Sequence, residues 1–164
     1  MKTHEEYMEL ALEEARKAEE IDEVPVGCVI VCGGEVISRG HNLKEQLNQA
    51  YAHAEMMAIQ KAAEVKGNWC LNDCDLYVTL EPCMMCTGII NLSRIRTVYY
   101  GTTDPKGGCL ETIIDLKKIN RLNHYPNIVG NILQKECSEI LTNYFRKKRE
   151  IIKEKKQKNK ANIQ

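Results

Sequence analysis

Apolar side chains recur at helical spacing near the start of this 164-residue chain. The positions that share a three- or four-residue spacing are Tyr7, Leu10, Ala11, Ala15 and Ala18. Thr3 and Glu6 stand just before and within this run at the spacing of a capping box, in which each side chain accepts a hydrogen bond from the other residue's backbone. The pattern therefore predicts an amphipathic helix from Thr3 to about Glu20.

Several later segments are rich in β-branched and apolar residues and have the length of strands. The first two, residues 26–32 and 35–41, flank Gly33-Gly34, which is typical of a β-hairpin. Short apolar runs at residues 76–80 and 97–100 predict two more strands.

Helix-forming segments alternate with these strands. Residues 54–66 are strong helix formers followed by Gly67, which suits a left-handed cap, and Pro82 is placed to open another helix. Gly, Pro and Asp at residues 101–108 predict a surface loop, and a closing helix is expected from Glu136 to about Lys153. This alternation predicts an α/β layered fold in which at least part of the sheet is parallel.

The size and composition of the chain fit one domain that needs no disulfide bonds. The chain has eight cysteines, but residues 1–20 are acidic and amphipathic and lack the apolar core of a signal peptide. Reduced thiols and a cytoplasmic location are therefore expected. The longest apolar run, residues 26–32, is too short to cross a bilayer, so no membrane partner is predicted.

A formal net charge of zero hides a strong asymmetry between the two ends of the chain. Residues 1–23 hold nine acidic against three basic side chains, whereas residues 144–164 hold nine basic against two acidic ones. The basic end could bind a phosphate backbone or simply be a solvated helix end. We predict one domain over residues 1–152, followed by a basic tail over 153–164 whose Lys-rich composition is compatible with disorder.

Candidate metal ligands occur in two short motifs. His53-Ala54-Glu55 lies at the predicted start of one helix, and the sequence Pro-Cys-Met-Met-Cys at residues 82–86 lies at the start of another. His53, Cys83 and Cys86 make three ligands, which leaves the fourth tetrahedral position of a zinc ion for water, as in catalytic zinc sites. Together the motifs predict a deaminase with one zinc ion, in which Glu55 takes a proton from the activated water and delivers it to the substrate.

A structural zinc site is the alternative that the cysteine spacing leaves open. Cys70 and Cys74 precede Cys83 and Cys86 at a usable distance, and four cysteine ligands would make an RNA-binding module with no catalytic role for His53. The remaining cysteines are expected to be small buried hydrophobic residues, namely Cys28, Cys32, Cys109 and Cys137.

The chain resembles the bacterial tRNA-specific adenosine deaminases, within the cytidine deaminase superfamily. The resemblance extends from about Tyr7 to Arg149. The stretches that carry it are Glu23-Val24-Pro25-Val26-Gly27, Ala52-His53-Ala54-Glu55, residues 77–86, Asp104-Pro105-Lys106, Leu122-Asn123-His124 and Tyr144-Phe145-Arg146.

This resemblance implies further substrate-binding residues. Asn42 would contact the adenine, Asp104 would lie beside the ribose of the target nucleotide, and Lys106 and Asn123 would grip the anticodon loop. From the residues alone, the alternatives are that Asn42 is a turn residue after a strand and that Asn123 is a plain loop residue.

The closing helix is implied to contribute to the same surface. Phe145 and Arg146, next to Tyr144, would touch the nucleotides that flank the target, because aromatic stacking and phosphate attraction suit a single-stranded loop.

The family also implies the architecture and the reaction. The expected fold is a three-layer α/β/α cytidine-deaminase-like fold with a mixed five-stranded sheet. The expected enzyme is a homodimer with one Zn²⁺ per subunit, whose two active sites each use surface from both subunits. It would convert the wobble adenosine of an arginine tRNA, presented in the anticodon loop, to inosine.

Three segments depart from the family pattern. This chain has Gln49-Ala50-Tyr51 where the family commonly has Asp-Pro-Thr, and residues 109–112 are Cys-Leu-Glu-Thr where small residues ending in Gly-Ser are usual. Tyr125 stands where a basic or amide residue is frequent. These segments border the expected substrate mouth, so a free-base or nucleoside deaminase acting on guanine or cytosine is the alternative function.

Overall fold

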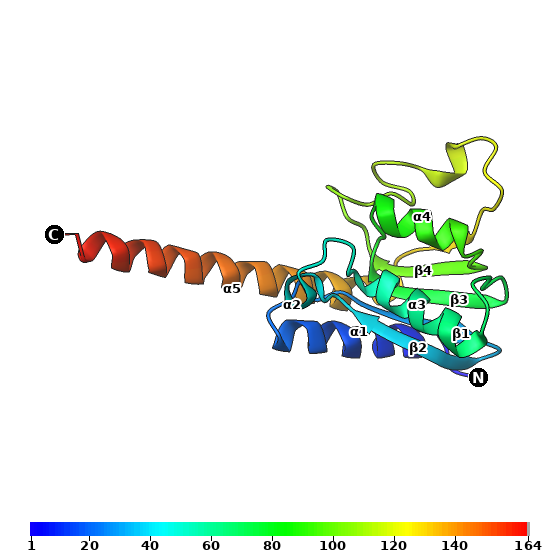
Figure 1. The fold of residues 1–164 in the computed structure, drawn as a ribbon. Helices are drawn as coiled ribbons and strands as arrows, with labels where there is room; N and C mark the ends of the chain where they lie inside the picture. Colours follow the sequence, from blue (N-terminus) through cyan, green and yellow to red (C-terminus); the bar gives the residue numbers. More distant parts are fainter. Residues whose placement is uncertain (164) are drawn as a thin grey trace.

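A mixed five-stranded sheet in the order β2-β1-β3-β4-β5 forms the middle of the molecule in the computed structural model, which describes residues 1–163 (Figure 1). Its strands are β1 Gly27–Cys32, β2 Glu35–His41, β3 Cys74–Leu80, β4 Thr97–Thr102 and β5 Asn127–Val129. β1 is antiparallel to both of its neighbours, β2 and β3, whereas β3, β4 and β5 pair in parallel. The predicted α/β fold with a mixed five-stranded sheet is confirmed.

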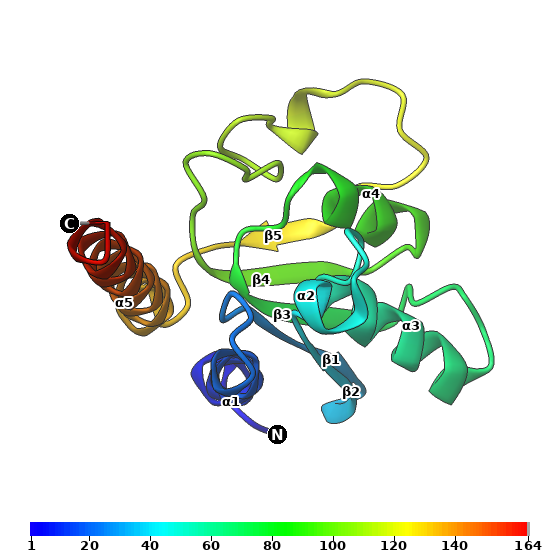
Figure 2. The same ribbon diagram turned by 60° about the vertical axis from the view of Figure 1, so that its left-hand side comes forward.

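Helices cover both faces of this sheet (Figure 2). The bounds of the helices are α1 His4–Glu20, α2 Lys44–Leu47, α3 Ala54–Lys66, α4 Met84–Leu92, a 3-10 helix at Leu116–Lys118, and α5 Gln134–Ala161. α1 and the first part of α5 lie on one face, and α3 and α4 lie on the other (Figure 2). The molecule is therefore the expected α/β/α sandwich.

The alternation of side chains along the central strands divides the core into two layers. Val29 and Tyr77 pack beneath α1, while Cys28, Ile30 and Val78 point to the α3 and α4 side. Since both faces of β1 and β3 are covered, these strands are apolar along most of their length.

Local signals in the sequence match the structure at the ends of several elements. Thr3 and Glu6 form the predicted capping box, and Gly67 caps α3 in the left-handed conformation. Gly33 and Gly34 have positive φ angles of 58° and 86° in the β1–β2 turn. This backbone conformation is strained for residues that have a Cβ atom.

Four details differ from the prediction. Cys83, not Pro82, caps the amino terminus of α4, so the proline lies one residue before the cap. α2 was not expected, and the position of the fifth strand, β5, was not predicted, because four- and three-residue elements carry too little periodicity to be seen. α5 continues past Lys153 to Ala161, because Lys, Glu and Gln are good helix formers even without packing. The segment predicted as a tail is thus helical through Ala161.

Within residues 1–163, none of the helices combines the length and the apolar composition that a membrane crossing requires.

Gly40 sets how closely α3 approaches the sheet. A Cβ atom at this position of β2 would lie 2.5 Å from the Ala54 carbonyl oxygen and 2.7 Å from the Ala58 nitrogen. Both atoms belong to the backbone of α3, which therefore cannot move aside without shifting the whole helix.

We predict that Gly40→Ala lowers the free energy of unfolding by about 1–3 kcal/mol, because the methyl group forces α3 away from β2. Chemical denaturation measures this change. Glu35→Ala, at an exposed position of the same strand, serves as control and should stay within about 0.5 kcal/mol of the parent. Equal stability of the parent and Gly40→Ala would contradict the close approach.

Candidate active site

Two helix amino termini converge at one end of the sheet. His53 is the N-cap of α3 and Cys83 is the N-cap of α4, and both have extended rather than helical dihedrals. Because a cap residue is released from the helical geometry, its side chain can turn toward the neighbouring helix. Cys86 follows in the first turn of α4, on the same face as Cys83.

The three predicted ligand atoms lie together. The Nδ1 atom of His53 is 3.6 Å from the Sγ atom of Cys83 and 3.7 Å from that of Cys86. A tetrahedral zinc ion with bonds of about 2.1 Å to nitrogen and about 2.3 Å to sulfur separates these atoms by about 3.6 Å. The observed spacing therefore fits zinc without rearrangement.

The four-cysteine alternative does not agree with the structure. Cys74 lies in β3 in a separate cluster with Cys32 and Asp73, and Cys70 joins neither group of candidate ligands among the residues described. Cys83 and Cys86 are grouped with His53 alone.

The surroundings of Cys83 favour the thiolate that a metal ion requires. Hydrogen bonding from Cys86 and from His53 lowers the pKa of the Cys83 thiol to about 4. The amino terminus of α4 acts in the same direction, because its unpaired amides carry a partial positive charge.

Glu55 lies in the first turn of α3, at the inner wall of a pocket of about 200 Å³. The pocket is also lined by His53, Cys83, Asn42 and Asp104. Burial raises the pKa of Glu55 to about 7, which places the carboxyl group between its two protonation states at neutral pH. Such a group can both accept and donate a proton during a reaction.

Two buried oxygen atoms in this pocket are left without a hydrogen-bond partner. They are Oδ1 of Asn42 and Oε2 of Glu55, and no other buried side-chain oxygen or nitrogen in residues 1–163 lacks one. Unpaired buried polar atoms are rare in folded proteins because each costs stability. Their shared location indicates a site that is completed by a polar ligand.

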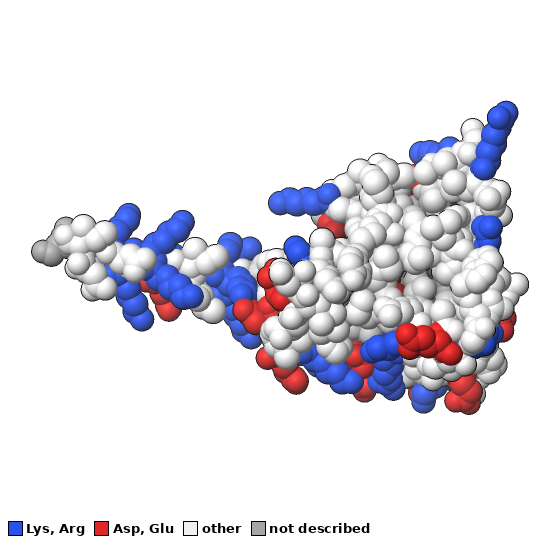
Figure 3. Space-filling model, in the orientation of Figure 1, with Lys and Arg blue, Asp and Glu red and all other residues white. Residues whose placement is uncertain are grey.

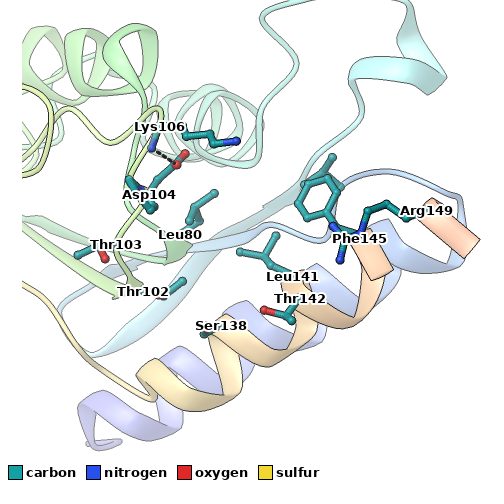
Figure 4. Close-up of a pocket in the computed structure, with 12 residues that line it drawn as sticks. Leu80, Thr102, Thr103, Asp104, Lys106, Ser138, Leu141, Thr142, Phe145 and Arg149 are labelled. Atoms are coloured by element: carbon teal, nitrogen blue, oxygen red, sulfur yellow. Dashed lines mark hydrogen bonds between the residues drawn. The ribbon is translucent and has the colours of Figure 1, made fainter. Parts of the chain in front are cut away.

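A larger groove of about 630 Å³ adjoins this pocket, between the end of β4 and α5 (Figure 4). Asp104 lines both cavities, while Lys106 and Phe145 line the groove from its two sides. The arginine that lines the groove is Arg149, whereas Arg146 was the arginine expected to touch the substrate. The helical spacing explains the difference, since Arg149 follows Phe145 by four residues and shares its face.

Arg146 and Asn123 do not lie with the other predicted residues. The Arg146 guanidinium donates to the side chain of Asn143, and neither residue lines the groove. Asn123 precedes His124, which is bonded to Asn91 and Ile95 at the far end of α4. Asn91 is about 8–12 Å along the helix from the two cysteines, and Asn123 lines neither the pocket nor the groove of this single chain.

Glu81 is a buried pocket residue that sequence analysis did not select. Its Oε2 atom accepts hydrogen bonds from the backbone amides of Leu110, Glu111 and Thr112 at 3.0–3.2 Å. Its Oε1 atom accepts from the Thr112 hydroxyl at 2.5 Å and from the Asp104 amide at 3.4 Å. Burial alone would raise the pKa of Glu81, but these hydrogen bonds outweigh it and lower that pKa.

Glu81 thus anchors the loop that carries Asp104, including the segment 109–112 that departs from the family pattern. A carboxylate directly before Pro82-Cys83 was the available signal, because a buried charge beside metal ligands needs several donors.

We predict that Glu81→Gln lowers the free energy of unfolding by about 2–3 kcal/mol, since an amide nitrogen cannot accept the donated bonds. Hydrogen exchange at the amides of residues 110–112 should become faster. Because the folded pKa of Glu81 is lowered, its stabilisation is present above the ordinary carboxyl pKa and is lost as the pH falls through the folded value. Glu111→Gln, which changes a single exposed acceptor, is the control; identical exchange in both variants would refute the anchoring role.

Comparisons with known proteins agree with this geometry. Residues 1–102 match the family described as cytidine and deoxycytidylate deaminase zinc-binding region. A tRNA-specific adenosine deaminase of Bacillus subtilis (strain 168) is 48% identical over 143 residues, which cover 87% of this chain and 89% of the relative. The enzyme of that name from Agrobacterium fabrum is 47% identical, over 90% of this chain and 96% of its own.

Solved structures give the same result. A structure from studies of A-to-I editing by tRNA:A34 deaminases at the wobble position of transfer RNA superimposes with a TM-score of 0.81 at 46% identity. The superposition covers 83% of this chain and 99% of the solved chain. A guanine deaminase from Nitrosomonas europaea has a TM-score of 0.73 at 21% identity, over 88% of this chain and 85% of its own, and shares the fold. The chain therefore belongs to the cytidine and deoxycytidylate deaminase family, among the tRNA-specific adenosine deaminases.

Proposed function

We propose that this protein converts adenosine to inosine at the wobble position of a tRNA, with one zinc ion per subunit held by His53, Cys83 and Cys86. The observation that carries the proposal is a cluster of three candidate metal ligands at the wall of a pocket. Two buried oxygen atoms in this pocket, on Asn42 and Glu55, have no hydrogen-bond partner. The names and the coverage of the relatives support tRNA as the substrate.

The roles of the pocket residues follow from their positions. When bound, zinc supplies an activated water by lowering its pKa toward about 7. Glu55 takes a proton at its carboxylate, gives it to a ring nitrogen of the base, and serves the departing amine in the same way. Asn42 offers its unpaired Oδ1 to the hydrogen-bonding edge of the base, as buried polar groups do in a specific site.

The two connected cavities suit a base that is flipped out of the anticodon loop. The pocket of about 200 Å³ would take the target base, and the groove of about 630 Å³ would take the neighbouring nucleotides. Phe145 gives the groove an aromatic surface for stacking, and Lys106 and Arg149 supply positive charge for phosphates (Figure 4). An anticodon loop presents unpaired bases, so flipping one out costs less than in a duplex.

The end of α5 extends the basic surface beyond this groove. All residues from Arg149 to Ile163 are exposed, and the helix projects from the body of the molecule with Lys and Arg side chains along it (Figure 3). Lys148 ties the base of this projection to Asp22 through an ion pair of 2.6 Å. We assign residues 1–152 to the deaminase domain and 153–164 to a basic tail that reaches tRNA phosphates.

A homodimer would complete the site. α4 exposes Met84 and Leu92, at 66% and 64%, and a shallow apolar groove of about 180 Å³ lies between this helix and residues 109–122. Apolar surface of this kind marks protein interfaces. Pairing through α4 would carry the partner subunit's Asn123 toward the zinc pocket, where one chain alone does not place it.

A cytoplasmic location is proposed with the tRNA substrate.

The roles of the metal and of the carboxylate can be separated by substitution. Glu55→Ala should keep its zinc and lose inosine formation by at least about a hundredfold, because only the proton carrier is removed. His53→Ala should lose the zinc itself, whereas Cys70→Ser, a cysteine outside the cluster, should lose neither. Zinc content by metal analysis and inosine by nucleoside mass spectrometry are the readouts. A fully active Glu55→Ala enzyme would remove this residue from the mechanism.

Substrate choice distinguishes the proposal from a small-molecule deaminase. Ammonia release should be rapid with an anticodon stem-loop RNA of a wobble-adenosine arginine tRNA and undetectable with free guanine, cytosine or adenosine. The same RNA with guanosine at the wobble position is the matched control. Turnover of a free base alone would assign the zinc site to the other deaminase class.

Charge on the projecting part of α5 should appear in the salt dependence of binding. Replacing Lys153, Lys155 and Lys156 by Gln should make the negative slope of log affinity against log salt shallower, by about 0.7–0.9 for each phosphate that is no longer neutralised. Lys135→Gln, at the opposite end of the same helix, is an exposed control that should leave the slope unchanged. Equal slopes for all variants would show that residues 153–164 do not contact tRNA phosphates and are only a solvated helix end.

A further inference from the structure

Cys32 and Cys74 face each other at the end of the β1–β3 pair, away from the zinc pocket. They are register partners in the two antiparallel strands, and their sulfur atoms lie within 4.8 Å of each other. The Cys74 amide donates to Leu71 and its carbonyl accepts from Arg96, so neither group is directed toward β1. In such a non-hydrogen-bonded pair the Cα atoms are about 4.5 Å apart, within the range that a disulfide spans.

The two thiols differ in their access to solvent and in charge. Cys32 is half-buried, and the Lys66 ammonium lies 3.6 Å from its sulfur. Of the pair, Cys32 is therefore the thiol that a small disulfide in solution reaches first. Cys74 is fully buried, and burial, with Asp73 and Cys32 beside it, raises the pKa of its thiol to about 12.

Asp73 connects these groups and argues against a second metal ion. Its carboxylate accepts from Cys32 at 3.3 Å and from Cys74 at 3.4 Å, and Lys66 binds it at 2.5 and 2.6 Å. Two sulfurs and a carboxylate resemble a metal ligand set, but here the Lys66 ammonium already binds the carboxylate and lies 3.6 Å from the Cys32 sulfur. A divalent cation would have to displace that charge.

We propose that Cys32 and Cys74 form a reversible cross-strand disulfide by exchange with a low-molecular-weight disulfide such as oxidised glutathione. The prediction that Cys32 is a buried hydrophobic residue is therefore wrong, since this thiol is accessible and bonded to charged groups. The cross-link would join β1 to β3 at the edge opposite the zinc site, leaving Cys83 and Cys86 untouched.

The exchange has two steps. The Cys32 thiolate attacks one sulfur of the small disulfide, forming a mixed disulfide on Cys32 and releasing one small thiolate. Cys74 then passes its proton to the Asp73 carboxylate, which accepts its hydrogen bond and releases the proton to solvent, and attacks the Cys32 sulfur, which expels the second small thiolate. Each released thiolate takes up a proton from solvent, so two protein thiols are oxidised and one small disulfide is reduced to two thiols.

Peptide mapping of the zinc-loaded, full-length protein tests this assignment. The protein is equilibrated with oxidised glutathione, its remaining thiols are alkylated, and the linked peptides are fragmented in a mass spectrometer. We expect a Cys32–Cys74 link as the main oxidised product, with zinc retained. Cys74→Ser should stop at glutathione on Cys32, and Cys32→Ser should leave Cys74 unmodified. Cys70→Ser, four positions before Cys74 and outside the cluster, should give the parent's yield.

The role of Lys66 has its own readout. Lys66→Gln should slow glutathionylation of Cys32 about threefold, because the ammonium 3.6 Å from the sulfur attracts the negative charge that the sulfur carries as it attacks. Asp73→Asn, which keeps the ammonium, should not slow it. Links from Cys32 to Cys70 or Cys28, or thiols that stay reduced when oxidised glutathione dominates, would overturn the proposal. A second zinc equivalent that disappears in Cys74→Ser would also overturn it and assign a metal site instead.

Discussion

The active site depends on strands that run in one direction and end at one edge of the sheet. β1 is antiparallel to both β2 and β3, so β2 and β3 share a direction, and β4 pairs in parallel with β3. Asn42, Cys83 and Asp104 each follow the carboxyl end of one of these strands. The crevice at the carboxyl ends of such strands is where α/β sheets bind ligands. Sheet topology thus brings together residues that lie far apart along the chain.

Helix packing completes this convergence. The absence of a side chain at Gly40 lets the backbone of α3 lie close against β2, which sets the position of His53 at the helix start. α4 begins shortly after β3, so its first turn delivers the two cysteines to the same point. Two amino-terminal helix dipoles then act on one small volume, which favours thiolates there.

Two buried carboxylates in the pocket have opposite surroundings. Glu81 accepts five hydrogen bonds and is held as an anion, so it organises the loop over the substrate groove. Glu55 has an oxygen without a partner and a pKa raised to about 7 by burial. Hydrogen bonding thus separates a carboxylate that supports structure from one suited to proton transfer.

Features that depend on neighbouring residues could be predicted from the sequence. Features that depend on contacts between residues far apart in the chain, or on the face of a helix, could not. Caps, the hairpin and the two ligand motifs were predicted because they depend on neighbouring residues. Glu81 was missed because most of its donors lie about thirty residues away, and β5 was missed because three residues show no period. Arg146 was expected from the family resemblance, whereas Arg149 lines the groove because it lies four residues after Phe145 on the same helix face. The proposed role of Asn123 depends on a second subunit, which sequence pattern does not describe.

The central claim is a metal held by three protein side chains with one coordination position left for chemistry beside Glu55. X-ray absorption spectroscopy at the zinc edge, on the zinc-loaded protein, tests this most directly by counting the scattering atoms around the ion. We expect two sulfur ligands, one imidazole and one light atom from solvent, with the imidazole signal absent in His53→Ala. Four protein ligands, or a sulfur count of three or four, would contradict the account.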